Sequence, residues 1–382
     1  MVAEERIKTT GSLKTSIEAV QEGVVKDLGG KGWKRAATYT RTLVTMLGVL
    51  NLRIVKVRDA STGRVTSPIL DMLAIRRRKY SREVKIVCAD MAARLSYNDS
   101  KIEFEKTTGI VIPKRTIHSF VQEIGALIAS SPRKANDIVL MADGTKTHSV
   151  YSTDNEVRVA ISCSPEGKSL FGLTVNKGWD SIPKATGPHI LVSDAERSIR
   201  SSLAENSDDI QLDLVHAVKE SLFKLWGEGM SKQERDEVSR EMKIILFTLV
   251  NSVKKHREDK DFKAIETRVE STLIELRELA RHLWRRGYRK ASNFISHNAR
   301  LMVTFAKLVT IGLDVPYTSN IMERMMGEVA KRCKHKWAHW STKGLENMLW
   351  ILLIRYTDTK SYEVFWKQYI HPSRIGLMPT TP

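Results

Sequence analysis

The sequence predicts a mixed α/β core that is interrupted by an all-helical insertion and preceded by a mainly helical N-terminal region. Short apolar runs typical of buried strands gather between residues 137 and 216. From about residue 217 to residue 314 strand patterns are almost absent, and the segment is charged and helical in character. A chain of 382 residues is long enough for two or three domains with sizeable cores.

The chain begins with residues 1–40, which are polar and charged and include the glycine-rich sequence GGKGWKR. We expect a poorly ordered arm or a short helix there. Part of Thr42–Val57 then alternates apolar and polar side chains, and the turn sequence DASTG follows it. This pattern predicts a small hairpin that leads into a helix.

Three helices are predicted in the rest of the N-terminal region, residues 41–130. Ser81 is the expected cap of the first helix, a short second helix covers about residues 100–106, and Pro113 lies near the start of the third. The order fits a helix-turn-helix, whose second helix enters the major groove of DNA, and an ordinary helical bundle is the alternative. The third helix starts with the basic residues Lys114 and Arg115, and the predicted inward-facing residues are Val84, Val87, Cys88, Met91, Leu95, Ile117, Phe120, Val121 and Ile124.

Five strands and a helix are predicted after a linker at residues 130–136. Two runs, DIVLMAD and HILVSD, are typical of buried strands, and two others flank Pro165-Glu166-Gly167 as a hairpin. A helix and a fifth strand, IQLDLVH, follow. Three strands, a link, a strand, a helix and a strand form the order of a ribonuclease-H-like core. In this order Asp143 and Asp194 lie at the carboxyl ends of the first and fourth strands, where open α/β sheets carry their sites.

The chain has 62 Lys and Arg against 44 Asp and Glu, a net charge of +18 at pH 7. Such an excess is common in proteins that bind polyanions, because neutralising phosphates releases counterions; a merely soluble basic protein is the alternative. The three cysteines form no CxxC pair, which argues against a disulfide framework or a zinc ribbon. With no signal-peptide or membrane-spanning pattern, we expect a soluble cytoplasmic protein.

Three acidic residues are the main candidates for a catalytic site. Asp143 and Asp194 end two apolar strands, and Glu323 lies on a later predicted helix. Each has a structural alternative, since Asp143 can form a turn with the next glycine, Asp194 can cap a helix and Glu323 can close a capping box. Together the three carboxylates can hold two divalent cations, which promote phosphodiester cleavage and transfer. Oxygen ligands favour Mg²⁺ or Mn²⁺.

Glu323 is favoured as the third ligand because its helical face continues through Gly327 and Ala330. Small residues permit another element to approach closely, so we expect this face to pack. Glu328 is five residues further along, points elsewhere on the helix and is the minor alternative.

Three further residues near the predicted carboxylates are candidates for auxiliary roles. Asp213 and His216 close the fifth strand, where the histidine could contact a substrate phosphate or a developing oxyanion. A structural role is the alternative for a lone histidine. Lys146 follows the first strand closely. Zinc is not expected, since no second ligand pair has suitable spacing.

A basic and aromatic segment, Lys331–Trp340, follows the Glu323 helix. Basic side chains interleaved with aromatic ones suit phosphate contact and stacking on an unpaired base. The alternative is a helix end that attracts cations, with its tryptophans in the core. Two other basic clusters, Arg76–Lys79 and Arg285–Lys290, could be solvated faces. The expected nucleic-acid contacts of the segment are Lys331, Arg332, Lys334, Lys336 and Trp337.

With these residues in view, the chain resembles the Mutator-like DDE transposases of bacterial and archaeal insertion sequences from about residue 40 to residue 360. The resemblance is carried by MADGTK, ILVSDAERSIR, the Asp213-x-x-His216 pair and TSNIMERMMGEVAKRCKHKWAHWSTKGLENML. Members of that family carry an acidic-x-x-His or Cys-x-x-His pair after the fifth strand. They also have a helical insertion between the second Asp and the Glu. The cysteine form of the pair is absent here.

The resemblance implies that Asp143, Asp194 and Glu323 are the metal-binding triad and that Asp213 and His216 are an auxiliary pair. It also implies a nucleoid-associated enzyme of a prokaryote that binds double-stranded DNA at terminal inverted repeats, as a dimer or larger assembly. Residues 315–382 would complete the core with the Glu323 helix and C-terminal helices. The rival hypotheses are a nuclease or resolvase that does not join DNA, and a DNA-binding descendant whose site is unused.

Overall fold

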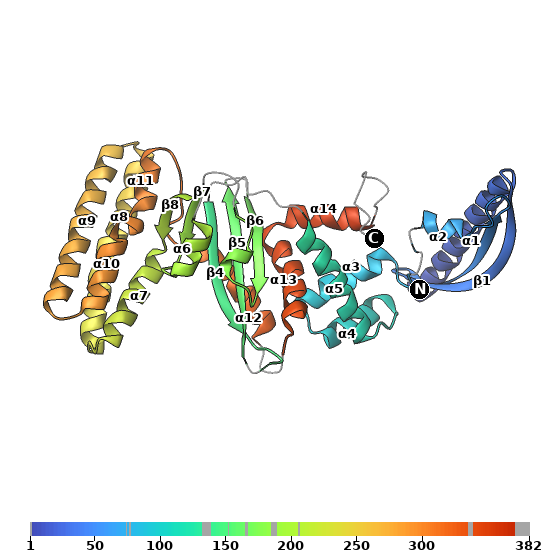
Figure 1. Cartoon of the computed structure of the whole chain (residues 1–382), viewed down its shortest axis with the longest axis horizontal. Helices are drawn as coiled ribbons and strands as arrows, with labels where there is room; N and C mark the ends of the chain where they lie inside the picture. The colour runs from blue at the N-terminus through green and yellow to red at the C-terminus, as the bar shows by residue number, and fades with distance from the viewer. Residues whose placement is uncertain are drawn as a thin grey trace. The chain divides into compact units, whose positions relative to one another are not determined.

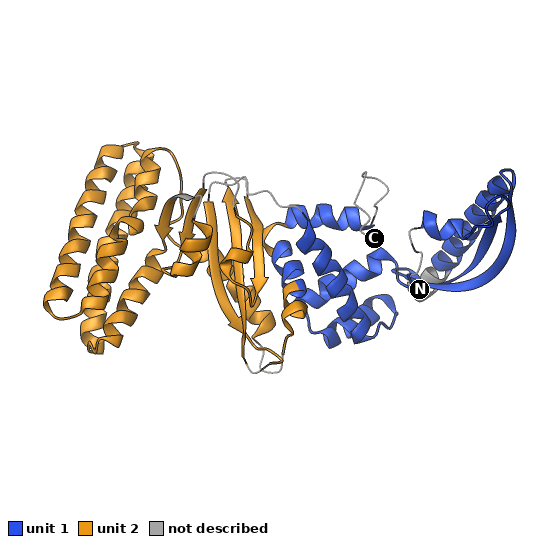
Figure 2. Ribbon diagram, viewed as in Figure 1, with its two compact units in different colours: residues 1–131, 347–355, 359–382 blue, residues 132–346, 356–358 orange. Residues whose placement is uncertain are grey.

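The computed structural model describes residues 2–73, 75, 78–131, 139–151, 153–164, 167–184, 189–204, 207–334 and 339–370, without the side chains of residues 2–7 and 207–208. The chain divides into two compact units (Figures 1 and 2). Most of the predicted linker, residues 130–136, lies outside the described residues. None of the described helices has the length and apolar character needed to cross a membrane. Unit 1 comprises Met1–Ser131, Asn347–Arg355 and Thr359–Pro382, and unit 2 comprises Pro132–Glu346 and Tyr356–Asp358.

Unit 1 begins with a long helix that packs on a hairpin. Helix α1 (Val2–Gly29) lies against strands β1 (Trp33–Thr45) and β2 (Gly48–Asp59), which pair antiparallel (Figure 1). The buried side chain of Gln21 ties the helix to β2, because it donates to a β2 carbonyl at 2.7 Å and accepts from the amide of Val55 at 3.0 Å. The core of this part contains Leu43, Leu50, Leu52, Ile54, Ile69, Leu70 and Ile75.

The prediction of a polar arm or short helix over residues 1–40 is wrong. Helix α1 runs for 28 residues, and residue 40 lies inside β1. The apolar residues of α1 that pack on the hairpin are widely spaced among charged ones, so the packed face leaves a weak pattern in the sequence. A hairpin is present, and it turns before Gly48, whose φ of +147° favours glycine. The DASTG sequence joins β2 to the short antiparallel strand β3 (Val65–Thr66) and precedes α2 (Pro68–Met72), so the predicted hairpin that leads into a helix is also present.

Three helices follow where three were predicted: α3 (Arg82–Arg94), α4 (Tyr97–Thr108) and α5 (Lys114–Ser130). Ser81 caps α3, since its hydroxyl accepts from an amide of the first turn. Helix α4 ends at Gly109 in the left-handed conformation (φ +67°), which glycine adopts without strain. The expected inward residues of α5 are all buried. On α3 the expected stripe is less complete, because Leu95 lies beyond the helix end and is exposed.

The C-terminal helices belong largely to unit 1. Residues 347–355 of α13 (Thr342–Thr357) and helix α14 (Thr359–Ile370) join it through the buried carboxylate of Asp90. One oxygen of Asp90 lies 3.0 Å from both Nε of Arg355 and the hydroxyl of Tyr362. The expected assignment of these helices to the core is therefore wrong. Contacts between residues about 270 positions apart in the sequence place these helices in unit 1.

Unit 2 contains a mixed five-stranded sheet in the order β6-β5-β4-β7-β8, as the α/β prediction requires. Strand β4 pairs antiparallel with β5 and parallel with β7, while β5 and β6 form the predicted hairpin and β7 pairs parallel with β8. Apolar side chains on this sheet and on α6 form one buried cluster. The elements are β4 (Val139–Thr147), β5 (Asn155–Ser164), β6 (Gly167–Val175), the short 3₁₀ helix η1 (Trp179–Ser181), β7 (His189–Ser193), α6 (Arg197–Leu203) and β8 (Ser207–Leu212).

The segment after β8 is helical, as predicted, although its first helix begins at Leu214 rather than near residue 217. Helix α9 packs against both α8 and α10, and α10 also packs on α7 (Figure 1). Helix α12 then returns to the sheet and packs against β4. The helices are α7 (Leu214–Gly227), α8 (Lys232–Glu258), α9 (Phe262–Arg285), α10 (Arg289–Met302), α11 (Thr304–Thr310) and α12 (Asn320–Cys333).

Candidate functional site

Asp143 and Asp194 lie beside each other at the centre of the sheet in unit 2. The parallel pairing of β4 with β7 ends at Ala142 and Ser193, so Asp143 is the next residue of β4 and Asp194 is the first residue after β7. Neighbouring strands are about 4.8 Å apart, which places the two backbones close together. Asp143 was expected at the end of its strand, but β4 continues to Thr147 because β5 pairs with it over that length. What ends just before Asp143 is the parallel pairing of β4 with β7.

Each of the two carboxylates accepts one nearby backbone amide. Oδ1 of Asp143 lies 2.7 Å from the amide of Gly144, and Oδ1 of Asp194 lies 3.0 Å from the amide of Glu196. The N-cap of α6 is Glu196, so Asp194 is not the helix cap that its position suggested. Within the described part of the chain, the second oxygen of either aspartate has no hydrogen-bond donor. An oxygen atom of each side chain is therefore available to a ligand.

Burial and mutual repulsion disfavour the charged forms of these two residues. Burial, followed by the charges of Asp194 and Glu323, raises the pKa of Asp143 from 3.8 to about 6, against the amide of Gly144 and the charge of His216. Burial also raises the pKa of Asp194, and the neighbouring carboxylate of Glu196 adds to it. Clustered carboxylates with raised pKa values are typical of sites that bind cations or exchange protons.

Glu323 lies in the first turn of α12, whose N-cap is Ser319. The alternative of a capping box is wrong, because the cap makes no side-chain bond to the helix. The Glu323 carboxylate instead lies 3.8 Å from Nζ of Lys219, and its side chain is 45% exposed. The expected close packing at Gly327 is also wrong, since a side chain there would meet no atom of another described element within 4 Å. Helix α12 packs through Met322, Met325, Met326, Val329 and Cys333.

Asp213 joins the first turn of α7 to the start of α12. It is the N-cap of α7, and its Oδ1 accepts the amide of His216 at 2.8 Å. Its Oδ2 accepts both the amide and the hydroxyl of Ser319. Burial opposes ionisation of this carboxyl, yet the hydrogen bonds from His216 and Ser319 outweigh it and lower the pKa to about 2. Asp213 therefore positions the helix that carries Glu323. From the sequence, Asp213 was predicted only as half of an auxiliary pair.

His216 was expected at the end of the fifth strand. It lies instead in the first turn of α7. Its Nδ1 is 3.3 Å from Oδ1 of Asp213, and the histidine side chain is 28% exposed. The Asp213 carboxylate raises the pKa of His216, although burial opposes this. Because His216 also lowers the pKa of Asp143, it lies within electrostatic reach of the paired aspartates.

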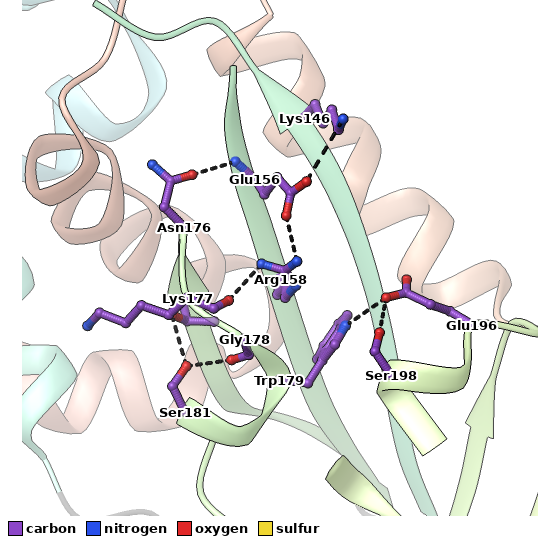
Figure 3. Close-up of polar contacts among 11 residues, drawn as sticks. Lys146, Glu156, Arg158, Asn176, Lys177, Gly178, Trp179, Ser181, Glu196 and Ser198 are labelled. Carbon is purple, nitrogen blue, oxygen red and sulfur yellow. Dashed lines mark hydrogen bonds and ion pairs between the residues drawn. The ribbon is translucent and has the colours of Figure 1, made fainter. Parts of the chain in front are cut away.

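A polar network that includes Trp179 and Glu196 was not predicted (Figure 3). Nε1 of Trp179 donates to Oε1 of Glu196 at 3.3 Å, and the amide of Glu196 is the donor to Asp194. The tryptophan ring also lies next to Gly144, where a Cβ would be 3.7 Å from it. Lys146, expected as an auxiliary residue, is 70% exposed and 3.9 Å from Glu156. No local sequence motif predicts the role of Trp179. The residue lies in η1, and its contact with Glu196 forms only in the folded chain.

The basic segment that begins in the last turn of α12 is only partly exposed among the residues that the structure describes. Lys331 is exposed and pairs with Glu328 at 2.7 Å, and Lys334 is exposed. The guanidinium of Arg332 lies 4.9 Å from the ring of Trp340, which is buried, so Trp340 belongs to the core as the structural alternative proposed. The remaining expected contacts, Lys336 and Trp337, lie outside the described residues.

Two other expected basic regions have different surroundings. Lys114 and Arg115 are exposed in the first turn of α5. Arg286 and Arg289, in the turn between α9 and α10, lie over the rings of Tyr288 and Trp284, so much of that cluster serves local packing. The arginines at positions 76 and 77 lie outside the described residues.

The candidate carboxylates do not form a closed cage for a metal ion. Among the described residues, no three His, Cys, Asp or Glu side chains stand close enough together to hold one. Asp143 and Asp194 nevertheless follow the last paired residues of two neighbouring strands, and the charge of Asp194 acts on Asp143, while Glu323 is turned towards Lys219. A donor set made only of carboxylate oxygens fits Mg²⁺ or Mn²⁺ rather than zinc.

Comparison with known proteins gives no family for this chain. No protein-family model matches it, and no curated protein matches it. A functional assignment therefore depends on the geometry of the site itself.

Proposed function

We propose that this chain is a DDE transposase with a ribonuclease-H-like core, which cuts DNA at transposon ends and joins them to a target. The observation that carries the proposal is the register of β4 and β7, which sets Asp143 beside Asp194. Glu323 lies on a helix that packs against β4, and its charge contributes to the raised pKa of Asp143. The strand order and the helical insertion between Asp194 and Glu323 agree with this assignment.

Asp143 and Asp194 would hold the cations through their free oxygens, and Glu323 would exchange Lys219 for a cation. When bound, two Mg²⁺ or Mn²⁺ ions supply an activated water or 3′-hydroxyl and neutralise charge on the leaving oxygen. Cation binding would also offset the charges of Asp194 and Glu323, which add to the effect of burial on the pKa of Asp143. Lys219, once released, remains beside the site as a cation for a phosphate.

His216 is the other chain residue with a direct task in this mechanism. Its protonated form is favoured by Asp213, and it can donate a hydrogen bond to a non-bridging oxygen of the scissile phosphate. In the first step the oxygen of water bonds to phosphorus, the bond from phosphorus to the 3′ oxygen breaks, and one proton of the water ends on that 3′ oxygen. In the second step the freed 3′-hydroxyl attacks a target phosphodiester and loses its proton, and the 3′ oxygen that it displaces gains one.

The wider chain supplies the charge and the elements for DNA binding. The net charge of +18 favours a polyanion, and Lys114 and Arg115 are exposed on α5, the second helix of the proposed helix-turn-helix. Joining two ends requires two active sites on one DNA complex, so the proposal includes a dimer or larger assembly.

The test is Mg²⁺-dependent cleavage and joining of a labelled duplex that carries the sequence flanking the gene. Wild type is compared with Asp194→Asn and with Asp236→Asn, an exposed carboxylate on α8 that serves as the matched control. We expect both products from wild type and the control, and none from Asp194→Asn, with DNA binding kept in all three. Equal activity in all three would refute the site. Cleavage without joining would identify a nuclease, and binding without cleavage would identify a DNA-binding descendant.

A further inference from the structure

A basic pocket lies next to Asp194 on the side of the helical insertion. It has a volume of about 620 Å³ and is lined by Ala195, which follows Asp194 in the chain, and by residues of α6, α7 and α10. Arg197 and Arg200 come from α6, Lys224 from α7 and Lys290 from α10. All of these residues belong to unit 2.

The positive charge of this pocket is largely unbalanced. Among the described residues Glu220 is its one acidic lining residue, and it pairs with Lys224 at 2.7 Å. Arg197, Arg200 and Lys290 have no carboxylate within ion-pair distance in the part of the chain that the structure describes. Unpaired cations that share a cavity repel one another, so an anion stabilises them.

Arg200 is held in place without being neutralised. Its guanidinium donates to the carbonyl of Ala195 at 3.1 Å and to Oδ1 of Asn298 at 3.3 Å, while its buried Nε has no partner. Each of its two terminal nitrogens carries a second N–H group, and a fixed guanidinium of this kind is well suited to a phosphate. Its neighbourhood also links the pocket to the active site, since the charge of Asp194 acts on Arg200.

The neighbouring face of α7 carries two exposed aromatic rings. Phe223 and Trp226 are 62% and 58% exposed, and their ring centroids are 5.7 Å apart. Helical spacing places them on one stripe with His216 and Lys219. At the other end of the helix His216 acts on the charge of Asp143, and Lys219 pairs with Glu323. Exposed rings beside a row of cations are the combination that binds single-stranded nucleic acid, because bases stack on the rings and phosphates contact the cations.

We propose that this pocket binds backbone phosphates of an unpaired DNA strand that continues past the scissile bond, and that Phe223 and Trp226 stack on its bases. The inference rests on the proposed function, because it takes the strand leaving the Asp143 and Asp194 site as the ligand. The chemistry recognised is a phosphate ester, so a free nucleotide is the other possible source.

The test measures binding in EDTA, where cleavage plays no part. Fluorescence anisotropy is recorded for a blunt duplex, for the same duplex with a single-stranded extension, and for ATP. The pocket variant is Arg197→Gln with Lys290→Gln, and the matched control is Lys232→Gln with Lys255→Gln, two exposed lysines on α8 outside the pocket. The ring variant is Phe223→Ala with Trp226→Ala, whose exposed side chains can be removed without opening the core.

We expect the pocket variant to bind the extended duplex about tenfold more weakly, with the salt slope reduced by about 1.4, because two phosphate contacts to the single strand are lost and fewer counterions are released. The ring variant should lose about tenfold on the extended duplex with its salt slope unchanged. Both variants should bind the blunt duplex like the control. Equal loss on blunt and extended DNA, or no loss on either, would overturn the inference. Loss of ATP binding alone would make the pocket a nucleotide site. Because cleavage is not measured, a specific loss on the extended duplex would support the pocket even if the wild type fails to cut DNA.

Discussion

Replacing Asp143 by asparagine should stabilise the protein while abolishing its reaction. The change is isosteric, and the asparagine carbonyl can still accept the amide of Gly144 that now bonds Oδ1 at 2.7 Å. What it removes is a buried negative charge beside Asp194 and Glu323. Residues selected for chemistry commonly cost stability in this way.

The magnitude follows from the pKa of Asp143. The folded value is about 6 against 3.8 for the ordinary group. The difference corresponds to at most about 3 kcal/mol of unfolding free energy at neutral pH. Because the folded pKa is raised, the folded state binds more protons between pH 4 and 6, and wild-type stability falls as pH rises through that window. The advantage of Asp143→Asn should therefore be near zero at pH 4 and largest above pH 6.

Calorimetry at pH 4, 5, 6 and 7 without divalent cations checks this, since it can resolve the melting of the two units. We expect Asp143→Asn to raise the melting temperature by a few degrees at pH 7 and to leave it unchanged at pH 4. Asp236→Asn removes the same charge from an exposed position and should shift it little at any pH. A destabilised Asp143→Asn at pH 7 would show that the aspartate is a structural residue, and the metal-site reasoning would fail.

Three other substitutions test separate parts of the structure. Asp213→Asn should cost about 2 kcal/mol of unfolding free energy at pH 7, because the amide group would face the two Ser319 donors. The pKa of Asp213 in the folded state is lowered to about 2, so the stability that its charge contributes should disappear as pH falls from 4 to 2, which urea unfolding can measure. Gly125→Ala should destabilise unit 1 by about 1–3 kcal/mol in calorimetry, because its Cβ would lie 2.2 Å from the carbonyl oxygen of Asn347; an unshifted melting temperature would contradict that contact. Trp340→Ala should cost about 3–5 kcal/mol and lower DNA affinity only through lost folding, so a stable variant with weak binding would restore its role in stacking.

Local patterns in the sequence identified most elements of unit 2. The strands before Asp143 and Asp194 are buried on both sides and therefore consist of continuous apolar runs, and the insertion has no competing strand pattern. The cap at Ser81 and the buried face of α5 were predictable because serine caps and helical periodicity act within a few residues. Helix α1 was missed, since its packed residues are diluted by charged ones and only the hairpin beneath it defines its face.

What the sequence by itself determined is the identity of the chemical groups: three acidic candidates, a basic chain and an α/β core. What only the tertiary structure decided is their arrangement. The end of the parallel β4–β7 pairing, rather than the end of a strand, places Asp143 beside Asp194. Asp213 acts through Ser319, 106 residues away, and Trp179 reaches Glu196 from a separate loop. Such contacts depend on strand register and on long-range hydrogen bonds, which arise between distant segments and leave no periodic signal in either one.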